Sequence, residues 1–327
     1  MFRKILNPDL YHGHNKKKNF FEGWYFKISD LKGENTFAFI PGIFLGKDDE
    51  CSHSFIQIVN GKDIKYDYLK YNKEDFSAAK DIFDVEVNKS NFSLNGISLD
   101  IDRPEIKIKG KVTFHNVKKW PDTFINPGSM GSYNYLTFMQ CYSQVCAMDI
   151  KLTGKINING QDISFDNGKG YIEKNWGKEF PHSWIWVQGN QFKNHNGSIS
   201  CSIGHIPFPL GSFRGFLIGL MIDDDFHTFT TMNKSKIKIK QREEDVEIKV
   251  ENKNYILNIN VLTKKEKFMT LKGPRGDKMI PLVNENLGGI VEVRLIDIKS
   301  NKEIFKDTTI CGGVEYGGDQ MIILDKN

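Results

Sequence analysis

The sequence lacks the features that would mark a secreted, disulfide-stapled or membrane-spanning protein. Its five cysteines are an odd number and include no Cys-x-x-Cys pair, so we predict no disulfide framework and no zinc or redox motif. The longest apolar stretch, residues 216–222, is far too short to cross a bilayer. The first residues contain no apolar segment of the kind found in signal peptides. We therefore expect a protein of a reducing compartment, the cytoplasm.

The sequence also lacks a strong excess of charge of one sign. The net charge is +4 over 327 residues, and the lysines are scattered among acidic residues, as in 236–245, which is typical of a solvated strand face. A nucleic-acid-binding protein would concentrate its basic residues on one face. There is no phosphate-binding glycine loop, and the eight histidines show no metal-ligand spacing. We therefore expect no nucleic acid, no cofactor and no metal.

Helix signals are scarce, and short segments that alternate polar and apolar residues fill the chain. Asn-Gly pairs at 60–61, 95–96 and 159–160 predict hairpin turns between such segments. The chain is too long for one small core, which suggests two domains or one large β assembly. We place the domains at residues 1–160 and 161–327. The predicted fold is all-β, with two antiparallel barrel or sandwich domains. The expected strands include residues 20–28, 36–43, 52–59, 105–115, 136–146, 149–158, 168–173, 183–192, 198–205, 213–222, 255–263, 289–298 and 304–316.

One expected strand, residues 20–28, carries an acidic residue among large aromatics. On a strand, Phe20, Glu22, Trp24 and Phe26 share one face. Buried glutamates are rare unless they are paired. Two interpretations stay open: a functional carboxyl group in an aromatic site, or a core strand whose Glu22 lies at an edge or pairs with a lysine.

A second unusual region begins at residue 170 and spans two expected strands. In the first strand, strand geometry places Tyr171, Glu173 and Asn175 on one face. The next strand alternates in the same way, and one of its faces carries two tryptophans and polar side chains. The tryptophans on this face need to be covered from water. That cover is either an apolar ligand inside a barrel or another protein surface. The residues on this face are Trp184, Trp186, Gln188 and Asn190.

These stretches resemble the tocopherol cyclase family. The matching strings are residues 21–25 (FEGWY), 171–177 (YIEKNWG), 180–181 and the alternating pattern of 184–192. The resemblance implies a lipocalin-like fold, related to carotenoid hydratases. It also implies a proton-initiated reaction on a prenyl alkene, in which a phenol oxygen or water captures the cation.

The resemblance implies roles for individual residues. Glu173 is the first candidate for the acid and Glu22 the second, because burial against aromatics keeps a carboxyl group protonated. Asn175 would orient a hydroxyl group beside the acid. Tyr25 and Tyr171 would contact the substrate. The residues that would line the cation or orient a hydroxyl group are Trp24, Trp176, Trp184, Trp186, Gln188 and Asn190.

One strand departs from the family pattern. Relatives are expected to carry an acidic residue and a histidine before Met148, whereas this chain has Gln140 and Ser143 in that region. The alternative function is therefore a carrier that kept the cavity and lost its chemistry. The expected partner is a lipophilic, prenylated small molecule. Such a ligand would allow transient contact with a membrane surface, and residues 208–211 form an apolar lip, although such runs are more often ordinary core. The lysine-rich composition suggests a bacterial source.

Overall fold

The chain folds into two compact units and contains two antiparallel sheets. The structure is a computed structural model that describes residues 2–209 and 211–325. The first unit comprises Met1–Phe180 and Lys272–Pro281, and the second comprises Pro181–Leu271 and Leu282–Asn327. This confirms the predicted all-β class with two lipocalin-like antiparallel domains. Leu210, in the expected apolar lip, lies outside the described residues.

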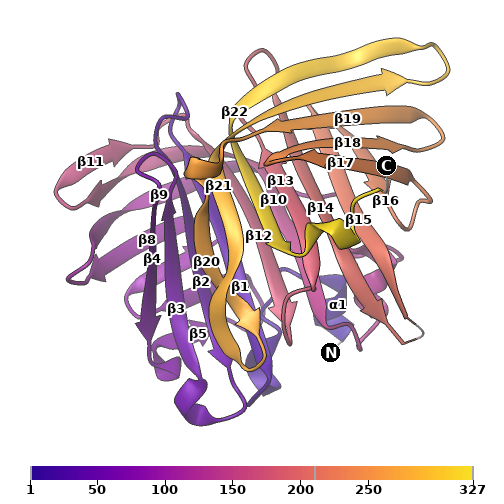
Figure 1. The fold of residues 1–327 in the computed structure, drawn as a ribbon. Helices are drawn as coiled ribbons and strands as arrows, with labels where there is room; N and C mark the ends of the chain where they lie inside the picture. Colours follow the sequence, from indigo (N-terminus) through magenta and orange to yellow (C-terminus); the bar gives the residue numbers. More distant parts are fainter. Residues whose placement is uncertain (1, 210, 326–327) are drawn as a thin grey trace. The chain divides into compact units, whose positions relative to one another are not determined.

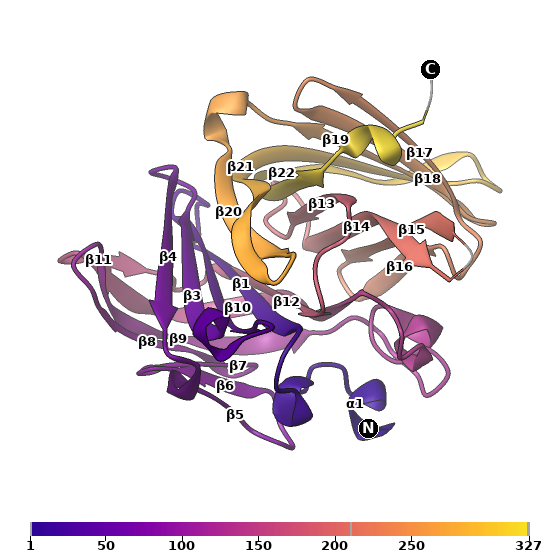
Figure 2. The ribbon, with the colours of Figure 1, turned by 60° about the horizontal axis from the view of Figure 1, so that its bottom comes forward.

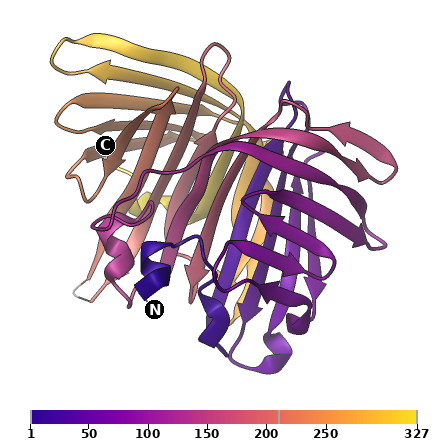
Figure 3. The same cartoon turned by 180° about the vertical axis from the view of Figure 1, so that it is seen from behind.

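The first sheet curves into a half-barrel (Figures 1 and 3). Its strand order is β4-β3-β2-β1-β12-β10-β9-β8-β7-β6-β5, with β11 paired to β10. Figure 2 shows how the sheet curls so that β6 comes back toward β2 and β3. The strands are β1 (Phe20–Ser29), β2 (Thr36–Leu45), β3 (His53–Asn60), β4 (Lys65–Tyr71), β5 (Phe76–Ala78), β6 (Asp84–Val87), β7 (Ser90–Ser93), β8 (Gly96–Asp102), β9 (Lys107–Lys118), β10 (Cys141–Ile158), β11 (Gln161–Ser164) and β12 (Lys169–Gly177).

The second sheet has the order β16-β15-β14-β13-β22-β21-β19-β18-β17, with β20 paired to β21. Its long strands β21 and β22 are joined by a turn at Asn301, which has a positive φ of 54°. The strands are β13 (Ser183–Gly189), β14 (Gly197–Phe208), β15 (Gly211–Ile222), β16 (Asp225–Thr230), β17 (Lys236–Arg242), β18 (Asp245–Glu251), β19 (Tyr255–Leu262), β20 (Met269–Arg275), β21 (Lys278–Asp297) and β22 (Lys302–Gly318).

Helical segments are short. The N-terminal α1 (Phe2–Leu6) is the one α-helix of the described residues. It precedes an irregular segment that runs beside the half-barrel and contributes to the site described below. The remaining helical turns are of the 3-10 type: η1 (Gly13–Asn15), η2 (Asp49–Cys51), η3 (Lys73–Asp75), η4 (Gly131–Tyr135), η5 (Lys265–Lys267) and η6 (Gln320–Ile322).

The strand β12 explains where the first unit ends. The domain boundary expected from the sequence, near residue 160, falls in the Asn159-Gly160 turn between β10 and β11, inside the first unit. Both turn residues have positive φ, 51° and 91°, as a tight hairpin requires. After β11 the chain continues into β12, which inserts between β1 and β10. The first unit therefore continues to Phe180.

The strand β10 differs from its prediction. The sequence suggested two strands, residues 136–146 and 149–158, whereas the structure has one strand from Cys141 to Ile158. Register shifts on the β12 side, between Val145 and Ala147 and between Ala147 and Ile150, interrupt the alternation. Such bulges bend a strand without ending it, and alternation alone cannot distinguish a bulge from a break.

Each unit has its own apolar core. In the first unit, the inner face of the half-barrel buries aromatic and aliphatic side chains that include Trp24, Phe26 and Trp176. In the second unit, Ile185 and Val187 of β13 join a core of mainly aliphatic residues. Because both faces of β1 and of β13 are buried, these two strands carry the candidate site residues into covered positions.

Candidate functional site

The two candidate acids lie on opposite faces of one sheet. In the antiparallel pair β1–β12, Trp24 is opposite Lys174, and Tyr25 is opposite Glu173. Directly opposed residues share a face and successive residues alternate. Glu22 therefore faces the core of the half-barrel, which we call the inner face. Glu173 faces the other way, on what we call the outer face.

On the inner face, Glu22 forms a buried ion pair with Lys174. Both side chains are fully buried, and Lys174 Nζ contacts Glu22 Oε1. The backbone N–H of His12 donates to Glu22 Oε2 at 2.8 Å. Lys174 also donates to the carbonyl of Leu10 at 2.7 Å. The ion pair therefore anchors the irregular N-terminal segment to β12.

This environment keeps Glu22 ionised. Burial by itself would raise the pKa of Glu22, but the charge of Lys174, together with His12, brings it below its ordinary value. Burial and the nearby Lys174 likewise lower the pKa of His12. Glu22 is thus the carboxylate that balances Lys174, as in the lysine-paired interpretation of this strand, and its surroundings do not suit a proton donor.

The tryptophans of the inner face already hold a cation. Lys174 Nζ lies 5.2 Å from the Trp24 ring centroid and 4.8 Å from that of Trp176. Such distances are typical of cation–π contacts. Trp176 is also stacked between His12 at 4.1 Å and Tyr142 at 5.2 Å. In this structure, the cation held by these two indoles is the ammonium group of Lys174.

On the outer face, Glu173 lies between two neutral hydrogen-bond donors. Tyr171 Oη donates to Glu173 Oε2 at 2.6 Å, and Asn175 Nδ2 to Oε1 at 3.5 Å. These bonds confirm that the three residues share a face. Glu173 is 7% exposed and Tyr171 is fully buried, with Tyr25 opposite Glu173 on β1. The outer face therefore holds a buried carboxyl group beside a phenol and an amide.

In the second unit, the two tryptophans of β13 lie against the backbone of β22. Trp184 Nε1 donates to Glu315 Oε1 at 2.5 Å. A Cβ atom at Gly317 would come within 2.0 Å of the Trp184 ring, and one at Gly313 within 2.7 Å of the Trp186 ring. This packing accounts for the absence of side chains at two positions of β22.

The same face of the second unit carries the other predicted residues. Gln188 follows Trp184 and Trp186 in the alternation of β13, and Asn190 comes just after the strand. Gln188 is fully buried and Asn190 is 2% exposed. The predicted site residues thus occupy three positions: the inner and outer faces of the first unit, and this face of the second.

The positions where relatives are expected to carry an acid and a histidine have other partners here. Gln140 Nε2 donates to Glu179 Oε1 at 2.6 Å. The backbone N–H of Ser143 approaches the sulfur of Met130 at 3.1 Å. The next residue, Gln144, donates to Asp9 Oδ1 at 2.9 Å. This end of β10 therefore makes polar contacts with neighbouring segments.

The sequence reasoning did not single out His12, Lys174 or Glu315. Lys174 alternates with Ile172 and Trp176, so its position between two core-facing residues was a signal of burial. His12 reaches Lys174 across 162 residues of sequence. Glu315 lies 131 residues from Trp184. No local pattern identifies partners so distant.

Among the described residues, no group of three or more His, Cys, Asp or Glu side chains is placed to hold a metal ion. Within the same part of the chain, no helix is long and apolar enough to span a membrane.

The fold and the sites define a class: an all-β, lipocalin-like protein of two units with carboxyl groups buried beside aromatic rings. The chain belongs to the tocopherol cyclase-like family, whose model matches residues 89–318. This match includes the outer-face residues Tyr171, Glu173 and Asn175 and the tryptophans of β13. It does not reach Glu22 or Trp24.

Individual relatives are distant. The chain is 22% identical to the chloroplastic protein of Oryza sativa subsp. japonica described as a probable tocopherol cyclase, over 94% of this chain and 77% of that protein. The structure of CghA with Sch210972 aligns with a TM-score of 0.58 at 9% identity, over 91% of this chain and 88% of that one. Kievitone hydratase from Nectria haematococca aligns with a TM-score of 0.50 at 11% identity, over 95% and 93%. These structures share the fold.

Proposed function

We propose that this protein is a cofactor-independent enzyme that protonates an alkene of a lipophilic, prenylated substrate. The resulting cation is captured by the substrate's own phenol oxygen, which closes a ring, or by water, which gives an alcohol. Membership of the tocopherol cyclase-like family and the name of the rice relative support the first outcome. The name of the kievitone hydratase supports the second.

The observation that carries the proposal is the contrast between the two buried glutamates. Lys174 neutralises Glu22 and keeps it ionised, so Glu22 has no proton to give. The contacts of Glu173 with Tyr171 and Asn175 come from neutral groups, which can hydrogen-bond to either protonation state of a carboxyl group. Glu173 is therefore our candidate for the acid.

In the proposed reaction, the proton of the Glu173 carboxyl group adds to one alkene carbon and leaves a tertiary cation on the other. The phenol or water oxygen bonds to that carbon and then loses its own proton. Glu173 takes this proton and returns to its starting state. Tyr171 stabilises the transient carboxylate through its hydrogen bond, and Asn175 lies within reach of a substrate hydroxyl group.

The remaining predicted residues keep supporting roles in the proposal. Tyr25 lies opposite Glu173 and offers an aromatic wall next to the acid. The indoles of Trp184 and Trp186, with the amides of Gln188 and Asn190, are proposed to contact the apolar part and the hydroxyl group of the substrate.

The test is the Glu173→Gln variant, which keeps the shape of the side chain and removes the acid. With a prenylated benzoquinol as substrate, we expect turnover to fall by about 10²- to 10⁴-fold, the usual contribution of general acid–base catalysis. Binding, followed by tryptophan fluorescence, should change little. Mass spectrometry identifies the outcome, since cyclisation leaves the mass unchanged and hydration adds one water.

The matched control is Glu86→Gln, on the exposed side of β6 in the same unit. It should retain full turnover. If Glu173→Gln turns over as fast as Glu86→Gln, Glu173 is not the acid.

A second candidate function is that of a carrier without catalysis. The observation that favours it is the start of β10, where Gln140, just before the strand, and Ser143 within it stand in place of the expected acid and histidine. If the protein is a carrier, the unmodified protein should bind the prenylated benzoquinol and release it chemically unchanged.

A further inference from the structure

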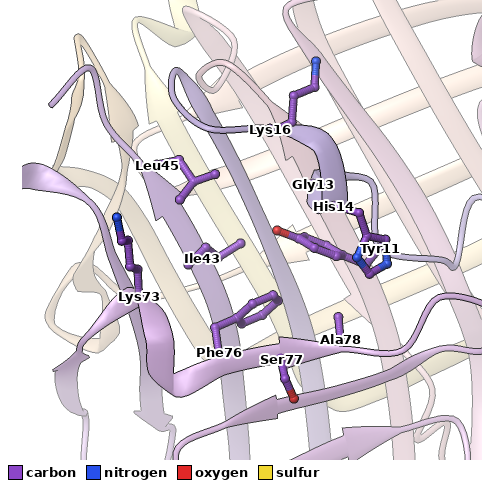
Figure 4. Close-up of a pocket in the computed structure, with 10 residues that line it drawn as sticks. All are labelled: Tyr11, Gly13, His14, Lys16, Ile43, Leu45, Lys73, Phe76, Ser77 and Ala78. Carbon is purple, nitrogen blue, oxygen red and sulfur yellow. The ribbon is translucent and has the colours of Figure 1, made fainter. Parts of the chain in front are cut away.

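The first unit contains a pocket that is separate from the outer-face carboxyl group. Its volume is about 400 Å³, within the range of small-molecule sites. It lies where the N-terminal segment passes over β2 near the edge strand β5, as Figure 4 shows. The residues that line it are Tyr11, Gly13, His14, Lys16, Ile43, Leu45, Lys73, Phe76, Ser77 and Ala78.

One wall of the pocket is apolar. Ile43 and Leu45 come from the inner face of β2, and Phe76 and Ala78 come from β5. The Tyr11 ring completes this wall, with its centroid 5.1 Å from that of Phe76. A surface of this composition favours an aliphatic chain or a ring over water.

A polar atom at this apolar wall has no protein partner. Within residues 2–209 and 211–325, the hydroxyl group of Tyr11 makes no hydrogen bond, and Figure 4 shows it directed toward Ile43 and Leu45. Burial raises the pKa of Tyr11, so the phenol stays protonated and can donate. Gly13 allows this placement, because a Cβ atom there would lie 2.2 Å from the Tyr11 oxygen.

The charged residues of the lining are all basic. The ammonium group of Lys73 pairs with Asp49 at 2.7 Å. Lys16 is exposed, and its side chain forms no ion pair in the described part of the chain. The imidazole of His14 lies beside the Tyr11 ring, at 4.8 Å between centroids. Lys16 therefore leaves one positive charge at the rim without a counterion.

The pocket is distinct from both buried glutamates. Neither Glu22 nor Lys174 lines it, and the Tyr11 ring, which does, packs on Trp24 at 6.0 Å. Glu173 faces the opposite side of the sheet. A ligand in this pocket would not reach the proposed acid.

We propose that this pocket binds a long-chain carboxylate. The aliphatic chain lies against Leu45, Ile43 and Phe76, and the carboxylate accepts a hydrogen bond from the Tyr11 hydroxyl group. The Lys16 side chain, which Figure 4 shows directed away from that hydroxyl group, turns toward the pocket to pair with the carboxylate. The protein then has a ligand site besides the one for the prenylated substrate. The site requires an anionic head group, in contrast to the neutral phenol of the proposed reaction.

The test compares two probes of equal chain length, a fluorescent long-chain fatty acid and the corresponding alcohol. The unmodified protein should bind the acid more tightly than the alcohol. Lys16→Gln should weaken binding of the acid by up to about fivefold, as expected for a partly exposed ion pair, and should leave alcohol binding unchanged. Lys18→Gln, in the same segment but outside the lining, is the control and should change neither.

A second variant tests the place of binding. Ala78→Phe fills the pocket from β5 and should abolish binding of both probes, while circular dichroism shows an intact fold and the benzoquinol is still converted. Equal affinity of the unmodified protein for acid and alcohol would overturn the proposal, as would fatty-acid binding that survives Ala78→Phe. Because Glu173→Gln should bind the fatty acid normally, failure of the catalytic proposal is recognised separately.

Discussion

At the scale of the residue, one lysine of the inner face determines the chemical role of the glutamate and the tryptophans around it. A glutamate among tryptophans suggests a proton donor and a cation site. Lys174 accounts for both features at once, because it pairs with Glu22 and lies near the rings of Trp24 and Trp176. The chemistry available at Glu22 is therefore that of a structural counterion, which is why we propose Glu173 as the acid.

Removing the charge of Lys174 tests this account of the inner face. Lys174→Met leaves the carboxylate of Glu22 buried without its counterion, so the free energy of unfolding should fall by about 3–5 kcal/mol. The double variant Lys174→Met with Glu22→Gln should recover much of this loss, because no unpaired charge remains. Chemical denaturation of the single and double variants measures the coupling. Simple additivity of the two single changes would argue against a buried ion pair.

The same network predicts that acid destabilises the protein. The folded-state pKa values of His12 and Glu22 lie below their ordinary values of 6.5 and 4.5. Such groups bind protons more readily in the unfolded chain. Their contribution to the free energy of unfolding is therefore complete above the ordinary pKa and is lost as the pH falls toward the folded-state pKa. As the pH falls, the contribution of His12 is lost first, below pH 6.5, and that of Glu22 is lost below pH 4.5.

We therefore expect the free energy of unfolding to fall between about pH 7.5 and about pH 5, and this loss to be smaller in His12→Gln. Denaturation curves at the two pH values measure both. An equal loss in the variant would show that other histidines cause the effect.

At the scale of the element, strand pairing decides which predicted residues can act together. Alternation correctly placed Tyr171, Glu173 and Asn175 on one face of β12. It could not place Glu22 on the opposite face of the same sheet, since this depends on the pairing of β1 with β12. These two strands are separated by more than a hundred residues of sequence, and pairing between distant strands leaves no local pattern.

The packing of β13 on β22 gives a prediction at this scale. In Gly317→Ala the new methyl group would overlap the Trp184 ring, which must move and break its hydrogen bond to Glu315. We expect a loss of about 1–3 kcal/mol in the free energy of unfolding, as for other overpacked sites. A red shift of the tryptophan emission should accompany it.

Gly288→Ala is the matched control for this substitution. Gly288 lies exposed in β21, and a methyl group added there would have Asn286 Oδ1 as its nearest atom, at an ordinary 3.6 Å. This variant should retain its stability and its emission spectrum. Equal losses in the two variants would mean that glycine is needed for the backbone and not for the tryptophan.

At the scale of the whole molecule, the sequence supports the class of fold better than the site. Alternation and Asn-Gly turns are local, so they indicate antiparallel sheets and the hairpin at Asn159. The network that joins His12 to Lys174 depends on an irregular segment that has no periodicity of its own. The family match covers β12 and β13 but leaves out the N-terminal segment. The pocket beneath that segment accordingly has no counterpart in the sequence predictions.

The measurement that tests the central claim most directly is the reaction carried out in heavy water with the prenylated benzoquinol. If Glu173 gives its proton to the alkene, the acid exchanges with solvent and the product carries one deuterium on carbon that does not wash out in ordinary water. Glu173→Gln should form almost none of this product. A product without carbon-bound deuterium, or a labelled product formed equally fast by Glu173→Gln, would contradict protonation by Glu173.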